Sequence, residues 1–583
     1  QVPGYNLAQP LPFFQGAGVV GTIDVGGLSR MGTDPTSPVT QPMKYLTWND
    51  DLTSARGKHV LKSGVLVEHG YSDRLSSLNN RGNYTFANVA QFLAGVPSRF
   101  QGVAPGAVLN RQRSSTLFGF YLQDDYRVTS SLTLNLGARY EFYTVPKEKN
   151  GLDAYLPDLL TSVDTVLGGP FVNPSKRNLA PRVGFAWDLT GDGRTAIRGG
   201  TGLYYDSDNP FNSSLGISAF TPPFAPAVTV SGPGIRFPNP SFEPSPGART
   251  LRTVDYHVKQ PRGWTYNVNL QRDLAGHWAV MVGYAGSRGH NLIQTYEGNP
   301  VVPTKLADGT LFFPANAPRR NPAWSTIDWR ASSGHSAYNA LQSTLMKRFN
   351  GGHQLQVSYT LSKAMDNNDS QLPPDTQSNS IYPANPYDLE SEWAVSSFDT
   401  PQVFVANATF ELPASSRHAV LSGWQLNGIV SLRSGYPFTP SLATPNWSRS
   451  GNIQGTAEDR PSVKPGTDPK RIITGNPDHW FDTSAFFLQP QGFLGTTPRN
   501  FLRGPGFANT DLSLVKNQTL GGGTRLQLRL EVFNVFNRAN FAVPTRTVFA
   551  AAAQDEAPLP SAGKVTRTVN SSRQVQLGVK LLF

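Results

Sequence analysis

The stretch LTLNLGARYEF, residues 132–142, decides the fold of this 583-residue chain. Apolar or aromatic side chains alternate with polar ones along it, so every second residue belongs to the same chemical class. The apolar set is Leu132, Leu134, Leu136, Ala138, Tyr140 and Phe142, and the other set is Thr133, Asn135, Gly137, Arg139 and Glu141. A period of two residues predicts a β-strand with one apolar and one polar face, because a helix would repeat every 3.6 residues.

The same alternation returns along the chain in pairs of segments. It is clear in residues 183–189, 264–271, 355–361 and 526–532. We predict seven hairpins and one final strand, which makes fifteen strands. The hairpins are 44–53/58–69, 115–126/132–145, 179–189/194–205, 262–273/277–288, 337–349/354–366, 400–412/420–434 and 507–517/524–536, and the final strand is 573–583.

The connections between these strands fall into two length classes. Turns within hairpins are short and rich in turn-forming residues, as in residues 190–193, Thr-Gly-Asp-Gly. Connections between hairpins are long and rich in Pro, Asn, Ser and Gly. This layout predicts an all-β, transmembrane antiparallel β-barrel with short periplasmic turns and long extracellular loops. A soluble sandwich or propeller also alternates, but its turns would not sort by length onto opposite ends.

Composition agrees with a membrane barrel and excludes other classes. No run of 18 or more apolar residues exists, which excludes helical membrane spans. The chain has no cysteine, and its net charge of +11 includes no run of five Lys or Arg, which argues against a nucleic-acid partner. Aromatic residues gather toward strand ends, as interface girdles require. They are Phe118, Phe120, Tyr140, Phe142, Trp264, Tyr266, Trp278 and Tyr284.

The C-terminus carries a separate signal. Apolar residues alternate to the last position, which is aromatic. This pattern resembles the terminal signature that the outer-membrane barrel assembly machinery recognises; a soluble edge strand is the alternative. The residues of the signature are Val575, Leu577, Val579, Leu581 and Phe583.

Several stretches together resemble a known family. Residues 118–128, FGFYLQDDYRV, followed by residues 132–141, resemble the barrel of TonB-dependent outer-membrane receptors. Residues 179–187 (LAPRVGFAW), 503–506 (RGPG) and 531–541 (EVFNVFNRANF) narrow the resemblance to the Oar-like branch, which has large extracellular loops. The resemblance runs from about residue 44 to the C-terminus.

The resemblance implies more domains than we find in the sequence. Members of this family carry a carboxypeptidase-regulatory-like β-sandwich, a plug domain with a TonB box, and then a barrel of 22 strands. No plug or TonB-box-like segment precedes the first strand that we predict, and single-chain bacterial barrels use even strand numbers. We therefore expect residues 44–583 to be the C-terminal part of a barrel, and residues 1–43 to be an extracellular loop remnant or a partial strand. Residues 18–29 are a possible sixteenth strand.

Charged residues at polar strand positions would line the lumen of the barrel. In the family they would contact the plug; without a plug they would line a water-filled channel. These residues are assigned to the lumen-facing side of the strands from the alternation of polar and apolar positions alone. The residues are Arg139, Glu141, Arg198, Arg348, Arg433, Arg529 and Glu531.

Motifs for enzyme chemistry or cofactors are scarce. Residues 16–21 match G-x-G-x-x-G, but no helix follows, so we interpret them as a loop. Residues 366–370, DNNDS, offer oxygen ligands without the spacing of a calcium loop, and a solvated loop tip is the favoured interpretation. Residues 434–438, SGYPF, would brace the barrel rim or stack on a sugar or peptide, and we favour the rim. We expect no enzyme activity, cofactor or metal.

The resemblance implies a function and a set of partners. The intact protein would bind a solute with its extracellular loops for energised uptake across the bacterial outer membrane. Its partners would be outer-membrane lipid and lipopolysaccharide, the barrel assembly machinery, and the TonB complex through a plug. Two alternatives stay open: a passive porin-like channel, and a surface adhesion or protein-export component.

Overall fold

A computed structural model describes residues 21–583 except 27, 36, 77–78, 104–106, 207–220, 226, 233, 238–248, 349–351, 369–379, 413–421, 444–445 and 453–456. Strands and loops make up nearly all of it. In this described part of the chain, no helix is both long and apolar enough to cross a membrane.

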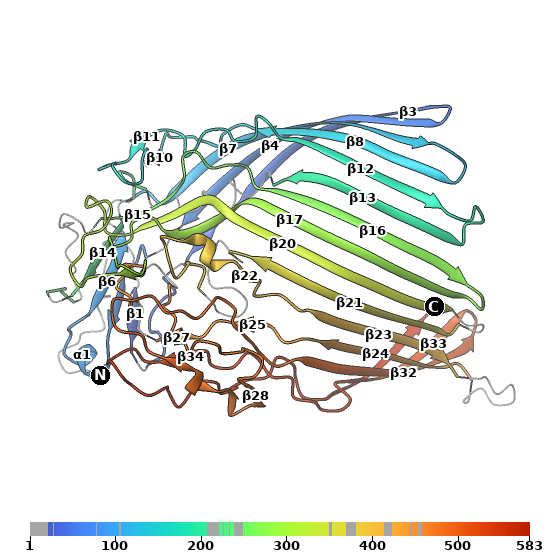
Figure 1. Ribbon diagram of the computed structural model, residues 1–583. Coiled ribbons are helices and arrows are strands. Elements are labelled where there is room, and N and C mark those ends of the chain that lie inside the picture. Colours follow the sequence, from blue (N-terminus) through green and yellow to red (C-terminus); the bar gives the residue numbers. More distant parts are fainter. Residues whose placement is uncertain are drawn as a thin grey trace.

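Fifteen long strands form one antiparallel sheet, the wall, in which each strand pairs with its neighbour in the chain (Figure 1). The number and order of the strands confirm the sequence-based prediction. They are β3 (Met43–Arg56), β4 (His59–Ser76), β7 (Asn110–Arg127), β8 (Leu132–Tyr143), β12 (Leu179–Asp188), β13 (Thr195–Tyr205), β16 (Arg262–Leu274), β17 (Trp278–Glu297), β20 (Ile327–Arg348), β21 (Gln354–Asp366), β23 (Gln402–Glu411), β24 (Trp424–Arg433), β32 (Phe507–Gly521), β33 (Thr524–Phe533) and β35 (Gln574–Leu582).

Short turns join the strands of the hairpins β3/β4, β7/β8, β12/β13, β16/β17 and β32/β33 at one end of the wall, the short-turn end. Between β32 and β33, Gly522 and Gly523 have φ of 59° and 84°, values that favour glycine and suit a two-residue hairpin turn. Between β12 and β13, the Asp188 carboxylate accepts hydrogen bonds from the backbone N–H groups of Gly191 and Gly193, at 3.0 and 2.8 Å. The long loops all emerge at the opposite, long-loop end (Figure 1).

The strand registers sort the side chains of the wall onto two faces. All eight aromatic residues predicted as girdles share one face with most of the strand leucines and valines, which we call the apolar face. Many of these side chains are exposed, among them Leu122, Trp187 and Leu341. A wall of this kind has no apolar core of its own, because its apolar face is built to meet lipid.

At the long-loop end, four strands extend beyond the predicted ranges: β4 to Ser76, β7 from Asn110, β17 to Glu297 and β20 from Ile327. β17 and β20 continue toward the long-loop end and pair there through an irregular segment, with register shifts between Gly289 and Gln294. β33 is shorter than predicted and stops at Phe533, because Asn534 and Asn537 adopt φ of 50° and turn the chain. The predicted boundaries therefore fail where a strand leaves the regular wall.

A smaller sheet lies at the long-loop end. It consists of β1 (Thr22–Val25), β5 (Asn83–Phe86), β6 (Arg99–Val103), β14 (Ala227–Ser231) and β15 (Arg249–Val254). The sixteenth wall strand suggested within residues 18–29 is wrong, because β1 pairs in parallel with β5 of this sheet. Val20, part of that suggestion, lies outside the described residues. Residues next to β5 form the short helix α1 (Val89–Leu93).

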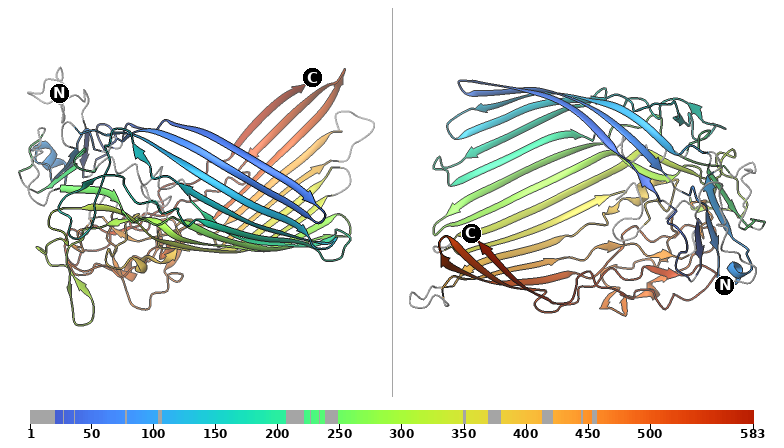
Figure 2. Two further views of the ribbon diagram at one scale, coloured as in Figure 1. Left: turned by 90° about the horizontal axis from the view of Figure 1, so that it is seen from above. Right: turned by 180° about the vertical axis from the view of Figure 1, so that it is seen from behind.

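The wall is an open trough. Among the described strands, β3 pairs along its length with β4, β35 pairs with β33, and no pairing joins β3 to β35. Seen from behind, the first strand (blue) and the last strand (red) lie at opposite edges of the wall (Figure 2). Both edges therefore present backbone groups that no described strand pairs.

Candidate functional site: the polar face and the loop assembly

The second face of the wall, the polar face, carries all seven residues predicted to line the lumen. Successive registers connect them without a change of face, from Arg139 in β8 to Glu531 in β33. The alternation therefore brings onto one face seven charged residues that span most of the sequence. They are Arg139, Glu141, Arg198, Arg348, Arg433, Arg529 and Glu531.

Most of these charges have partners within the wall. Arg139 forms an ion pair with Glu141, and Arg198 donates to the Gln271 side chain at 2.9 Å. The Arg433 guanidinium lies over the Tyr436 and Phe507 rings, 4.8 Å from each centroid. The polar face is thus a set of mutually satisfied groups more than a row of free charges.

A hollow of about 510 Å³ lies on the polar face, between β4 and β16. Three cationic residues line it: Lys62, Arg139 and Arg182. Lys62 pairs with Asp125 at 2.8 Å, and the Arg182 guanidinium stacks 4.3 Å from the centre of the Tyr204 ring. Planar, polar and cationic groups of this kind suit a polar solute or a polar protein surface.

At the long-loop end, parts of four loops fold together into what we call the loop assembly: described residues of 298–326, 380–400, 435–506 and 537–571. Its apolar core is formed mainly by the third and fourth segments. The fully buried members include Phe438, Phe481 and Val548. Since residues up to about 110 positions apart share this core, the third and fourth segments pack together as one unit.

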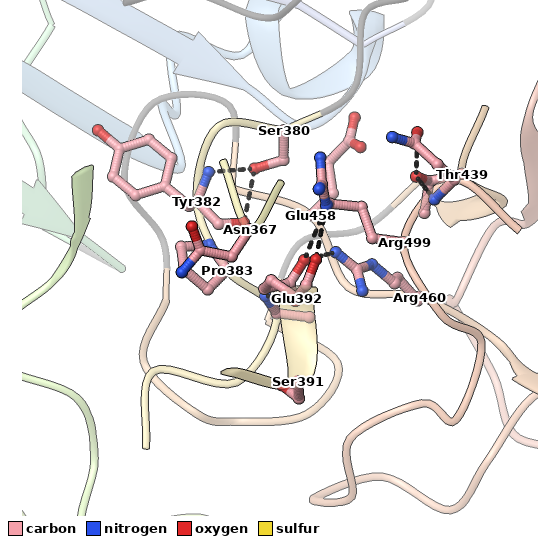
Figure 3. A network of polar contacts seen from close by, with 12 residues as sticks. Asn367, Ser380, Tyr382, Pro383, Ser391, Glu392, Thr439, Glu458, Arg460 and Arg499 are labelled. Atoms are coloured by element: carbon pink, nitrogen blue, oxygen red, sulfur yellow. Dashed lines mark hydrogen bonds and ion pairs between the residues drawn. The ribbon is translucent and has the colours of Figure 1, made fainter. Parts of the chain in front are cut away.

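Buried ion pairs hold the loop assembly together, and one of them joins it to the wall; Figure 3 shows Glu392 with Arg460 and Arg499. Glu392 pairs with Arg460 at 2.5 Å, and Arg499 pairs with Asp366 at the end of β21. The Arg499 Nε also donates to the backbone carbonyl of Glu392 at 2.9 Å. All four side chains are less than a tenth exposed. Removing one member would leave a charge buried without compensation, which is costly.

Further contacts connect the remaining loops. Arg503 pairs with Asp399 at 2.7 Å and donates to the Gly435 carbonyl, also at 2.7 Å. Arg319 donates to the carbonyl of Gly451 at 3.1 Å, and the Asn452 amide donates to the carbonyl of Pro383 at 2.7 Å. Each loop is thus held by at least one other loop.

Glu297, at the end of β17, is a buried carboxyl group with a perturbed pKa near the loop assembly. Its side chain is fully buried. One oxygen accepts hydrogen bonds from the backbone N–H groups of Asn299 and Ile327, at 2.8 and 2.9 Å, and the Arg319 guanidinium lies 3.9 Å away. Burial raises the pKa of Glu297 to about 7, against the opposing effect of Arg319.

Sequence reasoning missed the buried pairs of the loop assembly. Arg503 belongs to a stretch quoted for the family resemblance, but Glu392, Arg460 and Arg499 gave no signal. Their partners lie 68 to 133 residues away in the chain, and irregular loops have no period from which such pairing could be read.

Two loop motifs are explained by the structure. Asp366 and Asn367 are buried, so the prediction of a solvated loop tip is wrong for them: Asp366 binds Arg499, and the Asn367 side chain accepts from the His335 N–H at 2.9 Å. Residues 369–370 of that motif lie outside the described residues, as do residues 16–20 of the G-x-G-x-x-G match. In the described part of the chain no group of three or more His, Asp or Glu is placed to hold a metal ion.

The aromatic residues of the 434–438 motif are engaged inside the protein. Phe438 belongs to the apolar core of the loop assembly, and the Tyr436 hydroxyl accepts from Arg433. These contacts agree with the rim-bracing interpretation and occupy the rings that would otherwise stack on a ligand.

The C-terminal signature lies on the open edge of the wall. Val575, Leu577 and Val579 pair with Val532, Leu530 and Leu528 on the apolar face, and all three are more than half exposed. Leu581 follows on the same face, and Phe583 is the most exposed apolar residue in the described part of the chain. An apolar edge strand of this kind is accessible to a protein that recognises it by strand addition.

Comparisons with known proteins agree with this architecture. A family model described as "Outer membrane beta barrel domain" matches residues 3–576. The outer membrane transporter YddB from Escherichia coli is similar over 96% of this chain, with a TM-score of 0.51 and 13% identity. The FrpB iron transporter from Neisseria meningitidis (F3-3 variant) and the ferripyoverdine receptor of Pseudomonas aeruginosa each match 93% of the chain at 12% identity, with TM-scores of 0.44 and 0.45. No curated protein sequence matches the chain.

The chain is shorter than these solved proteins. It covers 57% of the YddB chain, 55% of the FrpB chain and 48% of the ferripyoverdine receptor. At 12–13% identity the likeness extends to the fold alone.

Proposed function

The chain belongs to the outer membrane beta barrel domain family of the bacterial outer membrane, and from this premise we propose that it forms barrel wall and extracellular loops of an Oar-like, TonB-dependent transporter. In the intact protein, the loops bind a solute and the polar face lines its path through the membrane. Uptake is then energised through TonB and a plug domain.

The loop assembly is the observation that carries this proposal. A simple channel needs loops that leave its mouth open, whereas here two of the four loops share an apolar core, and buried ion pairs and hydrogen bonds connect all four. Ordering several loops before a ligand arrives lowers the entropic cost of binding. A pre-organised extracellular surface above a polar wall favours selective capture over free diffusion.

The open edges of the wall support the view that residues 44–583 are one part of a larger barrel, with residues 1–43 on its extracellular side. A strand edge in lipid leaves backbone N–H and C=O groups without partners, which costs several kcal/mol per group. Further strands of the intact protein would satisfy β3 and β35 and close the barrel. A plug inside it would contact the polar face, including Arg139 and Arg529.

The remaining partners follow from the same proposal. Outer-membrane lipid and lipopolysaccharide surround the apolar face. The barrel assembly machinery recognises β35 through Val575, Leu577, Val579, Leu581 and Phe583. TonB acts only through the plug.

Three measurements on the protein purified from outer membranes of its source test the proposal: intact mass, peptide mapping and conductance. We expect an intact mass well above 63.4 kDa, peptides upstream of Gln1, and no steady conductance in planar bilayers. A mature protein that begins at Gln1 and forms an open pore would overturn it in favour of a passive channel. Loop-deleted cells that keep solute uptake but lose surface attachment would instead support an adhesion role.

A further inference from the structure

A cluster of polar and cationic side chains lies on the apolar face, toward the long-loop end of β16, β17, β20 and β21. The Tyr266 and Tyr284 hydroxyls both donate to the Asn339 side-chain oxygen, at 3.0 and 2.8 Å. The Arg288 guanidinium lies 3.4 Å from the same oxygen and 5.8 Å from the centre of the Tyr266 ring. Arg288 also donates to the backbone carbonyls of Ser287 and Tyr338, at 2.9 and 3.3 Å. Asn339 and these carbonyls thus hold two aromatic rings and one guanidinium in a fixed arrangement.

Three more groups that carry or can gain positive charge surround this arrangement. Lys363 is the register partner of Asn339, and Arg262 is the register partner of His290, one step beyond Arg288 on the same face. The side chains of Lys363, Arg262 and His290 are exposed, and Arg288 is half-buried. We call Arg262, Arg288, His290 and Lys363, with Tyr266 and Asn339, the outer-rim cluster.

Acidic residues are absent from this part of the apolar face. Along the regular register of the four strands, from the short turns to the outer-rim cluster, no described residue on this face is Asp or Glu. Nor does any carboxylate among the described residues pair with Arg262, Arg288 or Lys363 within 4 Å. The cluster therefore carries an excess of positive charge on the face that meets lipid.

The cluster lies at the depth of the outer leaflet headgroups. The opposite rim is marked by Trp278, whose ring lies 4.6 Å from the Lys347 ammonium. Arg288 follows Trp278 by ten residues in β17. At about 3.3 Å per residue and a tilt near 45°, this separation is about 25 Å, the height of the apolar band of a membrane barrel.

We propose that the outer-rim cluster binds the phosphate groups of lipopolysaccharide in the outer leaflet. Arg288, already oriented by Asn339 and Tyr266, donates to one phosphate, and Lys363 and Arg262 add charge on either side. The exposed Trp264 and Tyr284 rings contact the acyl chains and sugars below and beside it. Guanidinium groups match phosphate geometry closely, and cations near an interface are stabilised by anionic headgroups.

This inference rests on the part of the proposed function that surrounds the apolar face with outer-membrane lipid, and it adds the residues that select one lipid. Its test compares three forms of the full protein purified from outer membranes: the unaltered protein, the double variant Arg288→Gln/Lys363→Gln, and the double variant Arg272→Gln/Lys347→Gln. The last removes the same charge from the same face at the opposite rim.

The measurement is the amount of lipopolysaccharide retained in nanodiscs of phosphatidylethanolamine to which either intact or dephosphorylated lipopolysaccharide is added. We expect Arg288→Gln/Lys363→Gln to weaken retention of intact lipopolysaccharide by about tenfold or more, as loss of two charge-assisted contacts requires. Arg272→Gln/Lys347→Gln should retain it like the unaltered protein. Dephosphorylated lipopolysaccharide should bind all three forms equally weakly.

Equal retention by all three proteins, an equal loss in both double variants, or equal binding of dephosphorylated lipopolysaccharide would each overturn the inference. Restored retention in Arg288→Lys/Lys363→Arg separates loss of charge from a folding defect. Because retention is measured on purified protein, it can fail while solute uptake persists, and uptake can fail while retention persists.

Discussion

The wall and the loop assembly are two solutions to the same problem, that of holding a long chain in one conformation. In the wall, each strand pairs with the next in sequence, and apolar side chains such as Leu122 and Leu577 stay exposed for lipid. In the loop assembly, apolar and charged side chains are buried together, and their partners are far apart in the chain. The wall relies on a repeating pattern, and the loop assembly on individual pairs.

This difference predicts where the protein tolerates change. A wall strand loses little when one polar-face residue is replaced, because its hydrogen bonds come from the backbone. The loop assembly depends on particular side chains, so single replacements there should have large effects without disturbing the wall.

The largest effect is expected for Arg499→Ala. This change leaves Asp366 buried without its guanidinium partner and weakens the hold on Glu392, and we expect a loss of about 3–5 kcal/mol in the stability of the loop assembly. Denaturant unfolding followed by tryptophan fluorescence would measure it. The wall should keep its folded mobility on unheated gels.

The matched control for this change is Arg471→Ala. Arg471 pairs with Asp468 at 3.6 Å but is 88% exposed, so its loss should cost at most about 0.5 kcal/mol. If Arg499→Ala and Arg471→Ala lower the free energy of unfolding by the same amount, the buried ion pairs do not hold the loop assembly together.

A smaller effect is expected in the wall from Val282→Arg. Val282 lies on the apolar face midway between the Trp278 rim and the outer-rim cluster, where a cation in lipid costs about 2–4 kcal/mol. The neighbouring change Met281→Arg places the same charge on the polar face and should cost about 1 kcal/mol or less. Refolding into lipid vesicles compares them, and equal costs would mean that the two faces are assigned wrongly.

The smallest of these effects is a pH dependence that arises from Glu297. Because its pKa is raised from 4.5 to about 7, the folded protein holds this proton more tightly than the unfolded chain does. Ionisation of Glu297 therefore lowers the free energy of unfolding of the loop assembly as pH rises from about 4.5 to 7, by about 1–3 kcal/mol in total. Glu297→Gln keeps a hydrogen-bond acceptor without the charge.

The measurement for Glu297 is denaturant unfolding at about pH 5 and about pH 8. Relative to the unaltered protein, Glu297→Gln should gain stability at the higher pH and change little at the lower pH. A gain of equal size at both pH values would show that the charge of Glu297 is not its cause.

Almost all of the wall could be predicted from the sequence. Alternation located all fifteen strands and placed Arg139, Arg198 and Arg529 on one face, because a period of two leaves only two faces to choose from. It failed at the ends of several strands, among them β17, which continues through an irregular segment, and β33, where turn-forming asparagines end the strand. Of the outer-rim cluster, the sequence indicated only Tyr266, as a girdle aromatic beside Trp264 and Tyr284. Arg288 and Lys363 gave no signal in the sequence.

The loops were recognised from the sequence only by their length and composition. That Asp366 meets Arg499, or Glu392 meets Arg460, depends on how loops from three different hairpins pack above the wall.

The sequence by itself therefore determined a strand-rich membrane wall, its two faces and its two ends, since these follow from short-range alternation and turn chemistry. The tertiary structure alone decided that the loops form one body with buried charges, that residues 22–25 join a second sheet, and that Asn339 orients Arg288 toward lipid. The physical reason is the separation along the sequence between the residues that interact. Backbone pairing between successive strands repeats along the chain, whereas a buried ion pair is specified only when distant segments have already been brought together.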